Sequence, residues 1–217
     1  MKFVVQTLGE DIYLNEAISP LFPGQYANSR RISCDTYGGI SETEYTLNAL
    51  TYGWWLDNVY DFNDPDHVVL DGYSEGENRA RVTSAVITGL FLSGDDFSEA
   101  GSATGKARAT LFLTNKDINV LAKAGKSFRP VEGDTGSAAA NFFTESGGNR
   151  FYLAALNYSK TNINVAVDFS RIGLSPGQSY QVKELWSGAV FDASNALKLS
   201  LKPSDAAVYK ISAAVQK

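Results

Sequence analysis

Apolar residues in the first 125 positions follow two patterns, short runs and longer stretches with helical spacing. The runs at residues 11–16, 31–35 and 90–93 are short and end at polar or acidic residues. Strands of a parallel sheet are buried on both faces, so they read as short runs without strict alternation. We therefore predict three parallel strands in this part of the chain.

Three longer stretches begin with helix-capping signals. Residues 41–44 (Ser-Glu-Thr-Glu) and 74–77 (Ser-Glu-Gly-Glu) have the spacing of a capping box, in which a hydroxyl and a carboxylate each accept a hydrogen bond from a backbone N–H. Thr114 and Asp117 cap a third predicted helix, and Gly125 is placed to end it. Strands that alternate with helices in this way favour an α/β architecture.

The pattern changes after residue 126. Short segments follow, several of which alternate apolar and polar residues, and turn sequences such as Ser-Pro-Gly at 175–177 separate them. The predicted strands are residues 151–156, 163–169, 180–186, 197–201 and 207–211. Short alternating strands with regular turns predict an antiparallel β-sandwich. The chain is thus expected to have an α/β part over residues 1–126 and an all-β part over residues 127–217.

Composition and charge narrow the function classes. The chain has 217 residues and a formal net charge of -5, and its Lys and Arg residues form no basic patch, which argues against a nucleic-acid partner. The single cysteine, Cys34, excludes an intrachain disulfide and a thiolate metal cluster. No run of roughly eighteen apolar residues predicts a membrane-spanning helix. The compartment stays open between cytoplasmic and extracytoplasmic.

Carboxylates stand where the predicted strands end. Glu16, Asp35 and the Asp95–Asp96 pair close the three runs, and residues 63–67 (Asn-Asp-Pro-Asp-His) form a predicted turn with two more acids. Parallel βα units place their chemistry at the carboxyl ends of the strands. Retaining glycosidases need two carboxyl groups about 5 Å apart, one as acid/base and one as nucleophile. The positions of these acids are therefore typical of a sugar-cleaving site.

Four short motifs resemble, in order, those of the α-galactosidase (melibiase) clan, glycoside hydrolase families 27 and 36. Residues 31–35 (Arg-Ile-Ser-Cys-Asp) are similar to the clan's strand-seven motif, and residues 63–66 to its Asn-Asp-Pro-Asp turn. Residues 90–96 resemble the eighth strand and residues 116–119 the start of the last barrel helix. The resemblance implies strands six to eight of a (β/α)8 TIM barrel followed by a β-sandwich.

The resemblance also implies roles for particular residues. Asp35 would be the acid/base, and Arg31 would bind a sugar hydroxyl. Asp66 would line the sugar pocket, and Glu16 would hydrogen-bond the sugar. No cofactor is expected, and Asp95 and Asp96 are expected to make a poor metal site, because they are two adjacent acids without a His or a third acid. The substrate would carry a terminal α-linked galactose or a relative, with N-acetylgalactosamine and arabinopyranose left open.

The resemblance places strands one to five, and the clan's nucleophile Asp in a Lys-x-Asp pattern, before Met1. We therefore expect a truncated, C-terminal portion of such an enzyme that is inactive alone. The alternative is a non-catalytic carbohydrate-binding or structural fragment. An open parallel sheet would also expose an unpaired edge, which predicts self-association or pairing with the missing N-terminal half of the barrel.

Four other residues have simpler interpretations. Asp64 is expected to be a turn former, since Asn-Asp-Pro is good turn chemistry by itself. His67, the only histidine, is expected to pack beside the site, because these glycosidases use carboxylates. Trp54 and Trp55 are expected to pack in the core, with a sugar-stacking platform as the alternative.

Overall fold

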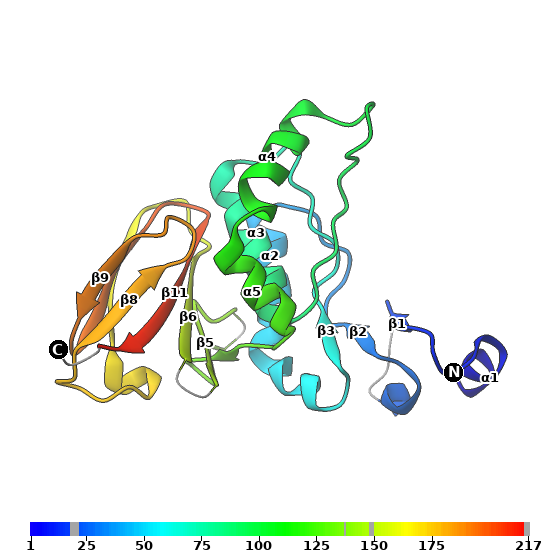
Figure 1. Ribbon diagram of the computed structural model, residues 1–217, viewed down its shortest axis with the longest axis horizontal. Coiled ribbons are helices and arrows are strands. Elements are labelled where there is room, and N and C mark those ends of the chain that lie inside the picture. The colour runs from blue at the N-terminus through cyan, green and yellow to red at the C-terminus, as the bar shows by residue number, and fades with distance from the viewer. Residues whose placement is uncertain (18–21, 137, 148–149, 215–217) are drawn as a thin grey trace.

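The computed structural model describes residues 1–17, 22–136, 138–147 and 150–214. Three layers lie side by side: a small parallel sheet, a group of helices, and a β-sandwich that contains the C-terminal residues (Figure 1). The chain therefore mixes helices and sheets and has an all-β part at its C-terminal end, as the pattern of apolar residues predicts.

The parallel sheet contains three very short strands in the order β1-β2-β3. They are β1 (Asn15–Glu16), β2 (Ser29–Arg31) and β3 (Phe62–Asp64). Two isolated parallel bridges, Asn63 with Gly89 and Val68 with Ser93, continue this arrangement on the far side of β3. The sheet therefore brings together four chain segments that are far apart in sequence.

These strands differ from the predicted ones in a way that matters for the site. Residues 32–35 lie in the loop after β2, and residues 90–93 form no strand, only the bridge at Ser93. The Asn-Asp-Pro-Asp segment, predicted as a turn, begins on β3 instead. Polar Asn and Asp disfavour strands, so the sequence pattern concealed a strand that pairing with β2 creates.

Most of the helices lie between the parallel sheet and the sandwich, and a short N-terminal helix lies beyond β1, on the side away from the sandwich (Figure 1). The α-helices are α1 (Lys2–Leu8), α2 (Ile40–Gly53), α3 (Glu75–Thr88), α4 (Ala103–Leu113) and α5 (Lys116–Ala124). The 3₁₀ helices in this part are η1 (Phe22–Tyr26) and η2 (Trp54–Asn58). Helix α4 lacks a predicted counterpart, since its sequence gives only a weak amphipathic pattern.

The capping predictions had mixed outcomes. The box at the start of α3 is confirmed: Ser74 N–H donates to Glu77 Oε2 at 3.1 Å, and Glu77 N–H donates to Ser74 Oγ at 3.3 Å. The box predicted at residues 41–44 is wrong, because α2 begins earlier and its Glu42 carboxylate accepts backbone N–H groups from residues 37–39. The cap predicted at Thr114 and Asp117 is wrong, because Asn115 caps α5 and accepts the Asp117 N–H. Gly125 ends this helix in the left-handed conformation as predicted.

The C-terminal part is an antiparallel sandwich of two sheets, in the orders β4-β5-β6-β11-β8-β9 and β10-β7. Its strands are β4 (Arg129–Pro130), β5 (Phe142–Gly147), β6 (Arg150–Asn157), β7 (Ile163–Asp168), β8 (Tyr180–Glu184), β9 (Val190–Ala193), β10 (Ala196–Leu201) and β11 (Asp205–Ala213). A 3₁₀ helix, η3 (Phe169–Ile172), follows β7. All five predicted strands are confirmed.

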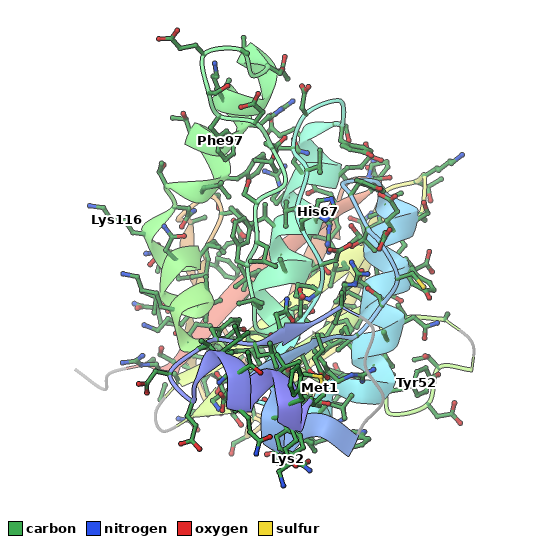
Figure 2. The ribbon with its side chains drawn as sticks, turned by 90° about the vertical axis from the view of Figure 1, so that its right-hand side faces the viewer. Met1, Lys2, Tyr52, His67, Phe97 and Lys116 are labelled. Carbon is green, nitrogen blue, oxygen red and sulfur yellow. The ribbon has the colours of Figure 1, made fainter. Side chains whose placement is uncertain are left out.

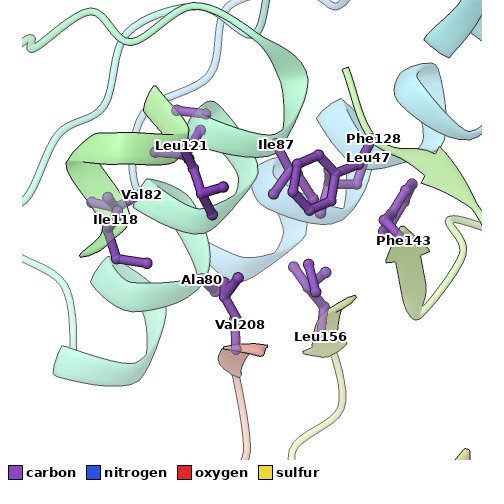
Figure 3. Close-up of a cluster of buried hydrophobic side chains, with 14 of the residues drawn as sticks. Leu47, Ala80, Val82, Ile87, Ile118, Leu121, Phe128, Phe143, Leu156 and Val208 are labelled. Atoms are coloured by element: carbon purple, nitrogen blue, oxygen red, sulfur yellow. The ribbon is translucent and has the colours of Figure 1, made fainter. Parts of the chain in front are cut away.

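Two hydrophobic cores hold these layers together. One lies between the two sheets of the sandwich, and the other packs helices α2, α3 and α5 against the outer face of β5, β6 and β11. Figure 3 shows this second core, in which Ala80 of α3 lies beside Val208 of the sandwich and Val82 of the same helix lies beside Ile118 of α5. The division predicted at residue 126 falls between α5 and β4 and stays a prediction, since this core includes residues from both sides of it.

Candidate functional site

The loops that follow β1, β2 and β3 meet at the side chain of Arg31, the last residue of β2. Its Nη2 pairs with Asp35 Oδ1 at 2.8 Å and its Nη1 with Asp66 Oδ1 at 3.1 Å. Its Nε donates to the Ala17 carbonyl, one residue beyond β1, at 3.3 Å. Parallel strands end at one edge of their sheet, so residues distant in sequence gather there. One guanidinium therefore connects all three loops.

Asp66 is the most tightly held member of the group. Its carboxylate accepts the Thr36 N–H at Oδ2 at 2.8 Å, and its own N–H donates to Asp64 Oδ1 at 2.8 Å. Its Oδ1 lies 3.0 Å from His67 Nδ1. Its φ of 68° lies in the left-handed region, which an Asp adopts more readily than most residues.

These contacts decide the charge of Asp66. Burial alone would raise the pKa of this carboxyl group. The hydrogen bonds from Thr36, His67 and Arg31 outweigh burial, because each favours the ionised form. The pKa of Asp66 falls to about 2. Asp66 is therefore an anion over the whole physiological pH range, and it raises the pKa of Arg31 even though burial lowers it.

Asp35 has the opposite environment. Its side chain is 67% exposed, and its ion pair with Arg31 spans four residues of one loop. The side chain of Asp66, by contrast, is only 9% exposed. The two carboxylates on one guanidinium thus differ in access: one is open to solvent and to a ligand, and the other is locked into the protein.

Glu16 lies on the neighbouring strand. It is buried and pairs in register with Arg30 of β2, and the next residue, Ala17, accepts the hydrogen bond from Arg31. The structure thus brings Arg31, Asp35 and Asp66 into one ion-paired group and places Glu16 on the adjacent strand end. The roles assigned to these four residues stay predictions.

A chain of polar side chains lies beneath the ion-paired group. Ser29 Oγ donates to Asn15 Oδ1 at 2.7 Å, Asn15 Nδ2 donates to Asp64 Oδ2 at 2.6 Å, and Asp64 accepts from the Asp66 N–H. This series of hydrogen-bonded side chains crosses β1, β2 and β3. Asp64 is therefore more than a turn former, because it joins two strands and fixes the backbone at Asp66. Sequence reasoning missed Asn15, although it precedes Glu16 at the same strand end.

His67 packs beside this group. Its ring meets Tyr37 edge to face with 5.1 Å between centroids, and a Cβ at Gly94 would lie 2.3 Å from its Cδ2. Figure 2 looks onto the parallel strands and shows His67 and Met1 on opposite sides of them. Trp54 packs on the helical core as expected, under the guanidinium of Arg129, which lies 4.4 Å from its ring centroid. The expectation for Trp55 is wrong, because this residue is 43% exposed.

The described residues include neither a cluster of potential metal ligands nor a helix suited to spanning a membrane. Within the described ranges, no three His, Cys, Asp or Glu side chains are grouped so that they could hold a metal ion. Asp95 instead accepts the N–H groups of Leu70 and Asp71 and so fixes a loop. None of the described helices is long and apolar enough to cross a membrane.

Comparisons with known proteins agree with the sandwich described above. Residues 141–211 match the family model of the alpha galactosidase C-terminal beta sandwich domain. A search of curated protein sequences finds no match. Over these residues the sandwich is therefore similar to the C-terminal domain of α-galactosidases.

Solved structures match nearly the whole chain. A glycoside hydrolase family 27 β-L-arabinopyranosidase from Geobacillus stearothermophilus, in complex with arabinose, matches with a TM-score of 0.75 and 17% identity over 98% of this chain and 53% of that one. The α-galactosidase I of Mortierella vinacea matches with a TM-score of 0.69 and 15% identity, over 90% of this chain and 56% of that one. The α-galactosidase of Saccharomyces cerevisiae matches with a TM-score of 0.59 and 11% identity, over 87% and 60%.

At such low identities, the TM-scores establish a shared fold and nothing more. The chain spans about half the length of the enzymes it matches. The resemblance to the α-galactosidase clan is thus confirmed, with this chain corresponding to a C-terminal portion of such enzymes.

Proposed function

We propose that this chain is the acid/base portion of a glycoside hydrolase of the α-galactosidase type. The substrate would carry a terminal α-linked galactose or a related sugar. The observation that carries the proposal is the convergence of Asp35 and Asp66 on the guanidinium of Arg31 at one edge of a parallel sheet. It matches the residue types and the spacing that the resemblance assigns to proton transfer and sugar binding.

The parallel sheet would be part of a (β/α)8 barrel. Strands β1, β2 and β3 run parallel, and the Asn63–Gly89 bridge adds a fourth parallel segment. If the Gly89 segment leads into the eighth strand, β3 is the seventh and β1 the fifth. Four units would then be present in place of the three expected from sequence, because the Asn-Asp-Pro-Asp segment supplies a strand of its own.

The geometry supports separate roles for the two carboxylates. Asp35 is exposed enough to reach a glycosidic oxygen, protonate it, and later take a proton from the attacking water. Asp66 is fixed and ionised, which suits an acceptor for sugar hydroxyls. Arg31 has five N–H groups, and its contacts with described residues involve one on each nitrogen; a second N–H of either Nη would donate to a sugar hydroxyl. Glu16 would complete the set of sugar ligands.

Retention of configuration would require a nucleophilic carboxylate about 5 Å from Asp35. The resemblance assigns that group to a Lys-x-Asp pattern, and the 217-residue sequence contains no Lys-x-Asp. We therefore propose that the chain alone does not hydrolyse glycosides. Turnover of an aryl α-galactoside by the purified chain, abolished in Asp35→Asn, would contradict this.

Sugar binding tests the proposal directly. Titration with galactose, N-acetylgalactosamine or arabinose, followed by NMR, should perturb the Arg31 side-chain N–H signals and the Asp35 and Asp66 carboxyl signals. The variant Arg31→Met should lose the perturbation. The matched control is Arg108→Met, since Arg108 pairs with an exposed carboxylate, that of Glu75 on α3. A chain whose Arg31, Asp35 and Asp66 signals ignore all three sugars would not be the portion proposed.

A second candidate function follows from the family match, which covers only the sandwich. In this alternative the sandwich binds carbohydrate or serves as a structural support, without catalysis. The same titration separates the two, because the perturbed signals would then lie on residues 141–211. Association with itself or with the rest of a barrel also stays a prediction. Within the described part, β1 is an outer strand of its sheet, and a monodisperse monomer in light scattering would count against such association.

A further inference from the structure

Arg81, on helix α3, is the largest charged side chain that the fold removes from solvent. Its exposed fraction is 0%, and none of the ion pairs among the described residues includes it. Burial lowers its pKa to about 10, so it remains a cation at neutral pH. A buried cation is costly unless hydrogen bonds replace its hydration. One of the groups that replace it is the hydroxyl of Ser84 on the same helix, 3.5 Å from Nη1; the others lie on the two loops of the candidate site.

The guanidinium of Arg81 binds both loops at once. Its Nη2 lies 2.7 Å from Thr36 Oγ1, on the loop after β2, and 2.8 Å from the Pro65 carbonyl, on the loop after β3. The same nitrogen lies 3.2 Å from the Asp66 carbonyl and 2.9 Å from the His67 carbonyl. Its Nε donates to the Tyr37 carbonyl at 3.1 Å. Each loop therefore supplies backbone acceptors to one rigid side chain.

The loop residues that Arg81 contacts also bind each other. Thr36 Oγ1 donates to the Pro65 carbonyl at 3.1 Å, and the Thr36 N–H donates to Asp66 Oδ2 at 2.8 Å. Thr36 follows Asp35 directly. A shift between the loops would therefore change both the position of Asp35 and the hydrogen bonds that keep Asp66 ionised.

We propose that Arg81 is a positioning residue that sets the distance between the Asp35 loop and the Asp66 loop. It touches neither carboxylate; it acts through the Thr36 hydroxyl and the carbonyls of the second loop. The catalytic meaning of this role rests on the proposed function, whereas the positioning itself can be measured without a sugar.

The test is the titration of Asp66 in the full chain, followed through its carboxyl carbon by NMR between pH 1.5 and 6. In the variant Arg81→Lys the positive charge is kept, because lysine is fully protonated in this range. The planar fork that spans two loops is lost. We expect the midpoint of Asp66 to rise by about one pH unit, a tenfold change in its acid dissociation constant.

Arg79→Lys is the matched control. Arg79 lies on the same helix and pairs with Asp205 of the sandwich through its Nε at 2.8 Å. It should leave the Asp66 midpoint unchanged. If Arg81 acts only as a charge or only stabilises the fold, Arg81→Lys will also leave that midpoint within 0.3 pH unit of the parent's, and the proposal is overturned.

A second variant decides the matter if Arg81→Lys does not fold. Thr36→Val keeps the size of a buried side chain and removes the hydroxyl that joins Arg81 to the Pro65 carbonyl. A raised Asp66 midpoint in this variant supports the proposal, and an unchanged one overturns it. A chain that binds none of the three sugars could still show either result for the Asp66 midpoint. The positioning role of Arg81 and the proposed function can therefore fail independently.

Discussion

The sandwich and the parallel sheet are stabilised in different ways. Strands β6 and β11 pair over residues 205–211 of β11, whereas β1 and β2 pair only over Asn15 and Glu16. The sandwich therefore derives its order from long backbone ladders and alternating apolar residues. The parallel sheet has too few ladder bonds for that, so side chains such as Arg31, Arg81 and Asp95 hold its loops by binding backbone groups. In the parallel sheet, a polar side chain that stabilises the fold, such as Arg31, is therefore also a candidate for binding or catalysis.

The largest expected effect tests whether the two regions unfold together. Phe143 on β5 is fully buried in the core shared with the helices. Phe143→Ala should lower the free energy of unfolding by about 3–5 kcal/mol, because it removes apolar contacts and leaves a cavity. Urea unfolding, followed by far-UV circular dichroism and by tryptophan fluorescence, measures it.

Phe191, 41% exposed on β9, provides the control, and Phe191→Ala should cost far less. Both probes should report one transition in each variant. Two separated transitions in Phe143→Ala would show that the helices and the sandwich are independent, contrary to the shared core.

The second-largest effect tests whether the hydrogen-bonded carboxylate of Asp66, next to the parallel sheet, stabilises the fold. The pKa of Asp66 is about 2 in the folded chain, against an ordinary value of 3.8. A carboxyl group whose pKa is depressed on folding stabilises the protein above its unfolded-state pKa, and the contribution disappears as pH falls through the folded-state value. Asp66→Asn should therefore cost about 2 kcal/mol at pH 6. Most of that cost should vanish between pH 4 and pH 2.

Urea midpoints across pH 2–7 measure the effect of Asp66→Asn. The control Asp168→Asn changes an exposed residue of β7 whose side chain makes no capping hydrogen bond. If the difference between Asp66→Asn and the parent chain is the same at pH 3 and pH 6, the Thr36, His67 and Arg31 contacts do not stabilise the ionised form.

The smallest effect tests whether local capping matters beside these contacts. Ser74→Ala removes the hydroxyl that accepts the Glu77 N–H at the start of α3. It should lower the free energy of unfolding by about 1 kcal/mol. Thermal unfolding compares it with Ser200→Ala, an exposed change on β10 that should be near neutral. A Ser74→Ala chain as stable as its control would mean that Glu77 alone satisfies this helix end.

The sequence predictions were more successful in the sandwich than in the parallel sheet. In β10, Leu197, Leu199 and Leu201 are buried and the residues between them are exposed, so the alternation alone locates the strand. In β3 the polar Asn63 and Asp64 are buried because β2 pairs beside them. No pattern of apolar residues could reveal that strand. The local sequence pattern was therefore strong enough to predict a strand of a long antiparallel ladder, such as β10. It was too weak to predict β3, which forms through pairing with β2.

For the site, the sequence indicated Arg31, Asp35, Asp66 and Glu16 by their places in motifs, and their roles stay proposals. It gave no sign of Arg81, because a helical arginine in a stretch of mixed polarity is ordinarily a solvated residue. Only packing shows that this guanidinium faces two loops and lies out of reach of water.

The sequence by itself determined the antiparallel character of the sandwich, the cap of α3 and the group of acids near the parallel sheet, since periodicity, caps and short motifs are local properties. The tertiary structure decided which acid is locked and which is open. The exposure of Asp35 and the burial of Asp66 depend on how Arg31 of β2, Thr36 of the following loop and Arg81 of α3 meet at the site. Contacts between residues so far apart in the chain leave no trace in any single stretch of sequence.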